Sequence, residues 1–181
     1  MPENRPSREL NLNPGEWSFG SGAVRLRTVL GSCVALVFWH PRRLLGGMCH
    51  YLLPCRVAMN PRALDGRYGD EALELMLGRI QALKAQPKEF RISVFGGGNM
   101  FPGRVRPDDN YLGRRNVEQA RHLLELHHLH CHNFHVEGVG YRTVVFDLAN
   151  GNIELNYLAL PRPPAPLMKS VRHEPYQSAD H

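Results

Sequence analysis

The sequence has no apolar run that approaches the roughly 20 residues needed for a membrane-spanning helix. Its first sixteen residues are polar and interrupted by proline, and they lack the apolar core found in signal peptides. These two absences argue against membrane insertion and against secretion. We therefore expect a cytoplasmic protein.

The chain also has no run of five or more basic residues, and no strand in which basic and aromatic side chains are interleaved. Those patterns are typical of nucleic-acid-binding proteins, so no nucleic acid partner is predicted. The formal net charge is nevertheless +5, from 22 Lys and Arg against 17 Asp and Glu. This modest excess favours a partner with an acidic surface.

Cysteine is scarce, because the sequence contains only Cys33, Cys49, Cys55 and Cys131. A chain in a reducing compartment keeps its thiols reduced, so we expect free cysteines rather than disulfides. One of these thiols is then available for chemistry.

The order of the predicted elements indicates one domain made mainly of strands. At 181 residues and 43% apolar composition, the chain is long enough for one well-formed core. We therefore predict an α/β fold, a single-domain layered sandwich of mainly β-sheet with two principal helices packed on it. The strands are expected over 23–28, 34–40, 44–53, 91–95, 134–139, 143–147 and 153–158, and the helices over 70–85 and 116–128.

Both ends of the chain are expected to lie outside this domain. Residues 1–17 are predicted to form a flexible segment, and the proline-rich tail 161–181 has too little apolar content to fold. The predicted domain therefore spans 18–160.

Local signals predict where the helices begin and where one hairpin turns. Asp70 is a preferred N-cap residue for the first helix, and Asn116 with Gln119 resembles a capping box at the start of the second. The pair Asn150-Gly151 predicts a type I′ turn between the last two strands.

A cysteine at the mouth of a buried strand is the first candidate for chemistry. Cys33 follows the turn Gly31-Ser32, and His50 lies on the next extended segment. A thiol must lose its proton to attack a carbonyl, and an imidazole can take that proton and later give it to a leaving group. Taken alone, such a pair is more often a small core cysteine and a satisfied buried histidine.

Five ordered motifs make the reactive interpretation specific. The motifs are Leu30-Gly31-Ser32-Cys33-Val34, then Gly46-Gly47-Met48-Cys49-His50-Tyr51-Leu52-Leu53-Pro54, Tyr68-Gly69-Asp70, Phe95-Gly96-Gly97-Gly98-Asn99-Met100-Phe101 and Arg114-Arg115-Asn116-Val117. With these motifs in this order, the sequence between about residues 18 and 158 resembles the chemoreceptor glutamine deamidase family, CheD.

The resemblance implies a protein-glutamine glutaminase, an amidohydrolase that converts particular glutamines of methyl-accepting chemoreceptors to glutamate. It also implies hydrolysis of receptor glutamyl methyl esters. The expected partners are the cytoplasmic domains of these receptors and a CheC-type phosphatase. Neither a metal nor an organic cofactor is expected.

The resemblance also assigns roles to three residues of this sequence. The family's catalytic cysteine and histidine match Cys33 and His50, and its third catalytic residue is a threonine ahead of the Gly-Ser-Cys turn, for which Thr28 is the candidate. Ser32 is an alternative to Thr28, although a residue on the turn itself more often stabilises the local backbone. The expected chemistry is a thioester formed on Cys33 with His50 as base.

Two other classes of function remain open at this stage. One is a binding module of the chemotaxis system that docks to receptors or to the phosphatase without turnover. The other is a deamidase that acts on a protein other than a receptor. Intact Cys33 and His50 argue against the first, and the lack of a translocation segment argues against the second.

Two further sequence features invite functional readings. Histidines gather between His122 and His135, but without the spacing of a zinc site, and a solvated helix end explains them better. The run Gly96-Gly97-Gly98-Asn99 lacks the Lys-Ser/Thr of a phosphate-binding loop. We expect it to be a tight connection near the active site, held by the Asn99 side chain.

Overall fold

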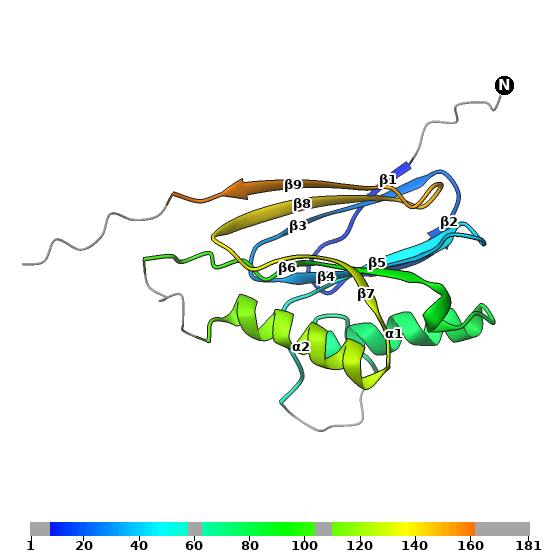
Figure 1. Ribbon diagram of the computed structural model, residues 1–181, viewed down its shortest axis with the longest axis horizontal. Helices are drawn as coiled ribbons and strands as arrows, with labels where there is room; N and C mark the ends of the chain where they lie inside the picture. The colour runs from blue at the N-terminus through cyan, green and yellow to red at the C-terminus, as the bar shows by residue number, and fades with distance from the viewer. Residues whose placement is uncertain (1–7, 58–62, 104–109, 162–181) are drawn as a thin grey trace, which may run out of the picture.

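Two β-sheets and a pair of helices form three layers in the computed structural model, which describes residues 8–57, 63–103 and 110–161 (Figure 1). One sheet lies on the other, and both helices cover the outer face of the second sheet. This arrangement confirms the predicted layered α/β sandwich. Within the described ranges, no helix is long and apolar enough to cross a membrane.

The first sheet has the strand order β1-β3-β8-β9. Its strands are β1 (Arg8–Asn11), β3 (Val24–Leu30), β8 (Gly140–Asp147) and β9 (Ile153–Ala159). β1 runs parallel to β3, whereas the other neighbours are antiparallel.

The second sheet has the order β2-β5-β4-β6-β7 and is the middle layer. Its strands are β2 (Trp17–Ser21), β4 (Val34–His40), β5 (Leu45–Tyr51), β6 (Arg91–Gly96) and β7 (Cys131–Val136). All seven residues of β4 are buried, as expected for a strand covered on both faces.

The helices are α1 (Gly69–Ala82) and α2 (Leu112–Leu126), and a short 3₁₀ turn, η1 (Pro87–Glu89), precedes β6. α1 buries Leu73, Met76 and Ile80 against the middle sheet, and α2 buries Val117 and Leu124 there. These residues recur at helical spacing, so the amphipathic pattern seen in the sequence places the helices on the sheet.

Both predicted helix starts are wrong, because neither helix begins with a side-chain cap, and α1 begins on tertiary contacts instead. α1 starts at Gly69, and its first N–H groups donate to the backbone carbonyls of Leu53 and Pro54. Asp70 is therefore inside the first turn and not the N-cap. α2 starts at Leu112, so Asn116 is a fully buried residue within the helix and forms no capping box.

The predicted flexible segment 1–17 differs from the structure over residues 8–17. Residues 8–11 form β1, which pairs with β3, and Trp17 begins β2, which pairs with β5. Residues 1–7 and the rest of the predicted flexible tail, 162–181, lie outside the described residues.

The histidine-rich stretch is only partly a helix end. α2 ends at Leu126, and the chain then turns through His128 at a positive φ of 53° into β7. His132 and His135 thus lie on a strand that the sequence predicts three residues too late. Among the described residues, no group of three or more metal-binding side chains is placed to hold an ion.

The hairpin between β8 and β9 is present, but its turn is not type I′. A type I′ turn needs positive φ at both central residues, whereas in this connection only Gly151 has one, at 79°. The Trp39 ring lies directly against Gly151, where a Cβ would be 2.2 Å from its Nε1. The connection is longer and is held by Asp147, whose carbonyl accepts from the Gly151 N–H and whose carboxylate accepts from the Ala149 N–H, both at 2.8 Å.

Candidate active site

The turn Gly31-Ser32-Cys33 carries the chain from the first sheet to the second, from the end of β3 to the start of β4. In the β4–β5 register, Ala35 lies opposite His50. Cys33 directly precedes β4 and packs in the same cluster as Ala35, so it faces the same way as Ala35 and is the diagonal neighbour of His50. Diagonal neighbours in an antiparallel pair lie about 7–8 Å apart, and their Cβ atoms are somewhat closer.

Thr28 faces His50 from the opposite sheet. Its Oγ1 lies 2.7 Å from His50 Nδ1 and donates its own proton to the carbonyl of Leu12, 2.8 Å away. Because the hydroxyl has one proton, which the Leu12 carbonyl takes, Oγ1 accepts a hydrogen bond from Nδ1–H. The ring therefore has its proton on Nδ1. Its Nε2 is therefore unprotonated and can accept a hydrogen bond, and it has no partner among the described residues.

Burial governs the protonation of both groups. It lowers the pKa of His50 below the ordinary value of 6.5, and hydrogen bonding at Leu12 and the negative charge of Glu16 oppose this. Burial also raises the pKa of the Cys33 thiol. Both shifts favour a neutral imidazole beside a neutral thiol over an ion pair. Such a pair reacts by general-base catalysis, in which the proton moves as the sulfur attacks.

The segment after β1 supports both residues. The Leu12 N–H donates to the Arg27 carbonyl at 2.8 Å, and this places the Leu12 carbonyl against the Thr28 hydroxyl. The same segment pairs with His50 itself, since Gly15 N–H donates to the His50 carbonyl and His50 N–H donates to the Glu16 carbonyl. Residues 12–16 therefore hold the imidazole in place, a role that the sequence does not predict.

Asn116 joins the Cys33 turn to the strand of His50. Its fully buried Nδ2 donates to the carbonyls of Ser32, at 2.9 Å, and Leu52, at 2.8 Å. Its own backbone carbonyl accepts a hydrogen bond from the Tyr51 hydroxyl. One amide thus holds the residue before Cys33 and a residue just after His50. The signal for it in the sequence is a polar residue four positions before Ala120, on the apolar stripe of the helix.

The glycine run after β6 packs directly on the Cys33 turn. Gly97 N–H donates to the Cys33 carbonyl and Gly98 N–H to the Gly31 carbonyl, both at 2.8 Å. Gly96 has a φ of 115°, and a Cβ there would lie 2.1 Å from the Cys33 carbonyl oxygen. Asn99 Oδ1 accepts from the Phe101 N–H, which confirms the expected connection held by an asparagine.

Two N–H groups of the Cys33 turn make no backbone hydrogen bond within the part of the chain that the structure describes. Among the described residues, neither Ser32 nor Cys33 donates its N–H to a carbonyl. Ser32 instead contributes its carbonyl to the Asn116 contact.

The remaining cysteines do not join this site. Cys49 is fully buried on the helix-covered face of the second sheet, opposite to His50, and burial raises its pKa to about 12. Cys55 is exposed beyond the end of β5, and Cys131 lies half-buried on β7. All four thiols are free, as the sequence predicts.

Comparison with known proteins identifies relatives across most of the chain. The model of the CheD family, described as CheD chemotactic sensory transduction, matches residues 52–157. A protein of Pseudomonas fluorescens (strain SBW25) called "Probable chemoreceptor glutamine deamidase CheD" is 47% identical over 80% of this chain and 82% of its own length. A protein of Albidiferax ferrireducens called "Probable chemoreceptor glutamine deamidase CheD 2" is 42% identical over 84% of this chain and 89% of its own.

The family-model match begins just after the three candidate catalytic residues. It starts at residue 52, whereas Thr28, Cys33 and His50 all precede it. The roles of these residues therefore rest on the geometry above and on the motifs around them.

Proposed function

This chain belongs to the CheD family, and from that membership we propose that it is a chemoreceptor glutamine deamidase. Its relatives bear that name, and its own residues supply a nucleophile, a base and an orienting hydroxyl in Cys33, His50 and Thr28. One observation carries the proposal. The Thr28 hydroxyl fixes the proton of His50 on Nδ1, so the buried Nε2 is ready to take a proton on the side of the ring away from Thr28.

The first step forms a thioester. The Cys33 sulfur bonds to the carboxamide carbon of a receptor glutamine while its proton passes to His50 Nε2. The amide oxygen becomes an oxyanion, which the N–H groups of Ser32 and Cys33 can stabilise. His50, now protonated on both nitrogens, gives the Nε2 proton to the amide nitrogen as the C–N bond breaks. Ammonia leaves, and the glutamyl group remains on sulfur.

The second step hydrolyses that thioester. Neutral His50 takes a proton from water, whose oxygen attacks the thioester carbon, and the proton returns to sulfur as the C–S bond breaks. The products are glutamate and the free thiol. A glutamyl methyl ester would react by the same two steps with methanol as the leaving group, so ester hydrolysis forms part of the proposal.

The direct test is incubation with purified receptor cytoplasmic domains, followed by peptide mass spectrometry. Conversion of amide to acid adds about one dalton at particular glutamines and releases one ammonia for each, as the chemistry above requires. A soluble protein with exposed glutamines serves as the second substrate. Equal modification of both would favour the deamidase of a non-receptor protein.

A binding module without turnover is separated from an enzyme by the reactivity of Cys33. Peptide-resolved alkylation is needed, because the exposed Cys55 also reacts. Receptor should slow alkylation of Cys33 and should be converted when alkylating reagent is absent. Binding without conversion would support the module. The expected CheC-type phosphatase partner is tested separately by co-purification of the two proteins.

Replacing Thr28 by valine should lower kcat by roughly 10- to 100-fold with little change in KM, because the imidazole loses the contact that sets its tautomer and orientation. Thr28→Ser, which keeps the hydroxyl, should recover most of the rate. The measurement is steady-state ammonia release for both variants. Equal rates in Thr28→Val and wild type would remove Thr28 from the mechanism.

The pH dependence follows from the lowered pKa of His50. His50 must be neutral to accept the thiol proton, so kcat/KM should rise through a midpoint below 6.5 and then level off near neutral pH. A profile measured from pH 5 to 9 with one receptor fragment checks this. An acid limb centred above pH 7 would contradict the neutral-pair mechanism.

A further inference from the structure

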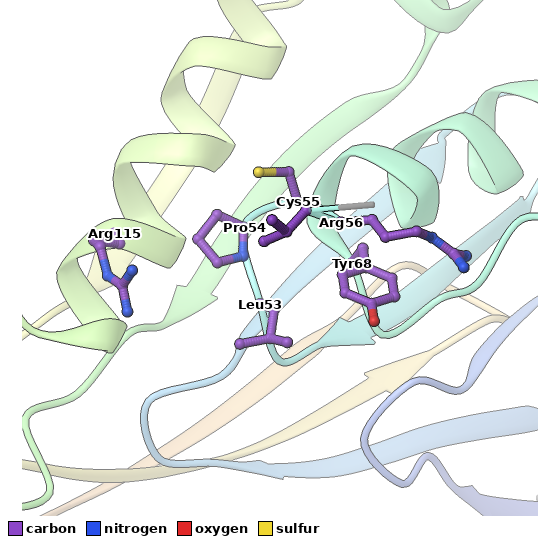
Figure 2. A pocket seen from close by; sticks show the side chains of 7 residues that line it. Leu53, Pro54, Cys55, Arg56, Tyr68 and Arg115 are labelled. Carbon is purple, nitrogen blue, oxygen red and sulfur yellow. The ribbon is translucent and has the colours of Figure 1, made fainter. Parts of the chain in front are cut away.

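A groove opens where the two helices begin, beside the segment that leaves β5. Its volume is about 390 Å³, and apolar side chains of that segment, among them Leu53, Pro54 and Val57, line it. Figure 2 shows this segment between Tyr68, at the start of α1, and Arg115, on the first turn of α2. Leu53 is 40% and Val57 97% exposed, so the apolar surface faces solvent.

The groove lies at the same end of the sheet as the nucleophile. Val34 pairs with Tyr51, so continuing the register places Leu52 opposite Cys33, and the groove begins at the next residue, Leu53. The Asn116 amide contacts Ser32 and Leu52 at once, and Arg115 precedes it. Cys33 packs on the side of the middle sheet that faces the first sheet, whereas the groove lies on its helix side, so a ligand that contacts both must cross this end of the sheet.

The groove carries positive charge at the start of α2, a helix end where acidic side chains are usually preferred. Arg114 and Arg115 lie on the first turn of α2, which has no acidic residue, although the helix dipole favours acidic side chains at that end. Arg56 also lines the groove, but both of its hydrogen bonds at 2.7 Å go to Glu71. Across the described residues, no carboxylate lies within ion-pair distance of Arg115.

We propose that this groove docks a helical segment of the receptor, with a glutamate about one turn from the target glutamine bound by Arg115. This deepens the proposed function and rests on it. A helix with its side chains is about 10–12 Å across and rises 5.4 Å per turn, so one helix laid over the sheet end can insert a glutamine toward Cys33 and place its next turn on the groove. The apolar floor takes the aliphatic part of that turn, and Arg115 takes its carboxylate.

Two variants test the two halves of the groove. Arg115→Glu should raise KM for a receptor fragment by about 10-fold or more, because it places like charges together, while the alkylation rate of Cys33 stays at the wild-type value. Val57→Ser, at a residue that is almost fully exposed, should raise KM by a few-fold without loss of stability. Arg79→Glu, the same charge change on an exposed residue in the last turn of α1, is the matched control and should leave KM unchanged.

The outcomes separate this proposal from the function on which it rests. Wild-type conversion together with an unchanged KM in Arg115→Glu and Val57→Ser would overturn the groove and leave the deamidase intact. An equal rise of KM in Arg79→Glu would show that KM responds to the net charge of the protein and not to docking in the groove. A lowered alkylation rate of Cys33 in Arg115→Glu would show that Arg115 maintains the conformation of the Cys33 turn and does not bind the receptor. No conversion by wild type would overturn the function itself.

Discussion

Replacing Cys33 by alanine is expected to abolish ammonia release from a receptor substrate, a loss on the order of 10⁴-fold or more. The sulfur is the atom that would carry the glutamyl group, and no other thiol is placed beside His50, since Cys49 faces the opposite side of the sheet. Cys33 is half-buried on a turn, so the smaller side chain should cost about 1 kcal/mol of stability or less. Ammonia release, receptor mass and thermal unfolding together measure these expectations.

The matched control is Cys131→Ser, which removes a half-buried thiol on β7 and should keep wild-type activity. Cys33→Ser adds a second comparison, because a hydroxyl at the same position is far less easily deprotonated than a thiol. Conversion at the wild-type rate by purified, folded Cys33→Ala would end the nucleophile assignment.

Replacing His50 by glutamine is expected to lower kcat by on the order of 10²- to 10⁴-fold at neutral pH. Without the base, the thiol must ionise by itself, and burial has raised its pKa. The residual activity should therefore keep rising with pH beyond 9, the ordinary thiol pKa, whereas the wild-type rate should be level there. Rates measured up to pH 10 on the same receptor fragment check both parts.

His40 provides the control for this substitution. Among the described residues it is the other buried histidine, 3% exposed at the far end of β4, where it contacts Phe90. His40→Gln should therefore keep the wild-type pH profile even if it lowers thermal stability. A His50→Gln variant with the wild-type profile would show that another group takes the thiol proton.

The sequence predicts best where periodicity and burial coincide. The apolar run of β4 and the helical stripe of α1 lead directly to the middle sheet and the layer on it. β1 and β2 are not predicted, because they are short: β1 has one apolar residue, Leu10, and the alternation in β2 extends only over Trp17 and Phe19. The helix starts are mispredicted for a different reason, since the groups that begin α1 are backbone carbonyls of residues 53 and 54.

The candidate site likewise contains residues that the sequence predicts and contacts that it does not. Cys33 and His50 are visible in the sequence by residue type and motif, and Thr28 by its place ahead of the turn. The structure brings Thr28 to within 2.7 Å of His50, a contact between residues 22 positions apart on different sheets. The Leu12 carbonyl that accepts the hydrogen bond of the Thr28 hydroxyl has no signature in the sequence, because every residue has a backbone carbonyl.

The Thr28–His50 contact crosses from one sheet to the other, and this links catalysis to the order of folding events. Neither sheet alone contains both partners, so the imidazole can be oriented only after the two sheets have packed through Leu26, Met48 and Phe146. Contacts of large sequence separation form slowly, as β8 must close on β3 across more than 100 residues. During refolding from denaturant, enzymatic activity should therefore return after the helical signal, in step with the closing of the sandwich. The catalytic rate becomes a kinetic probe of that last step.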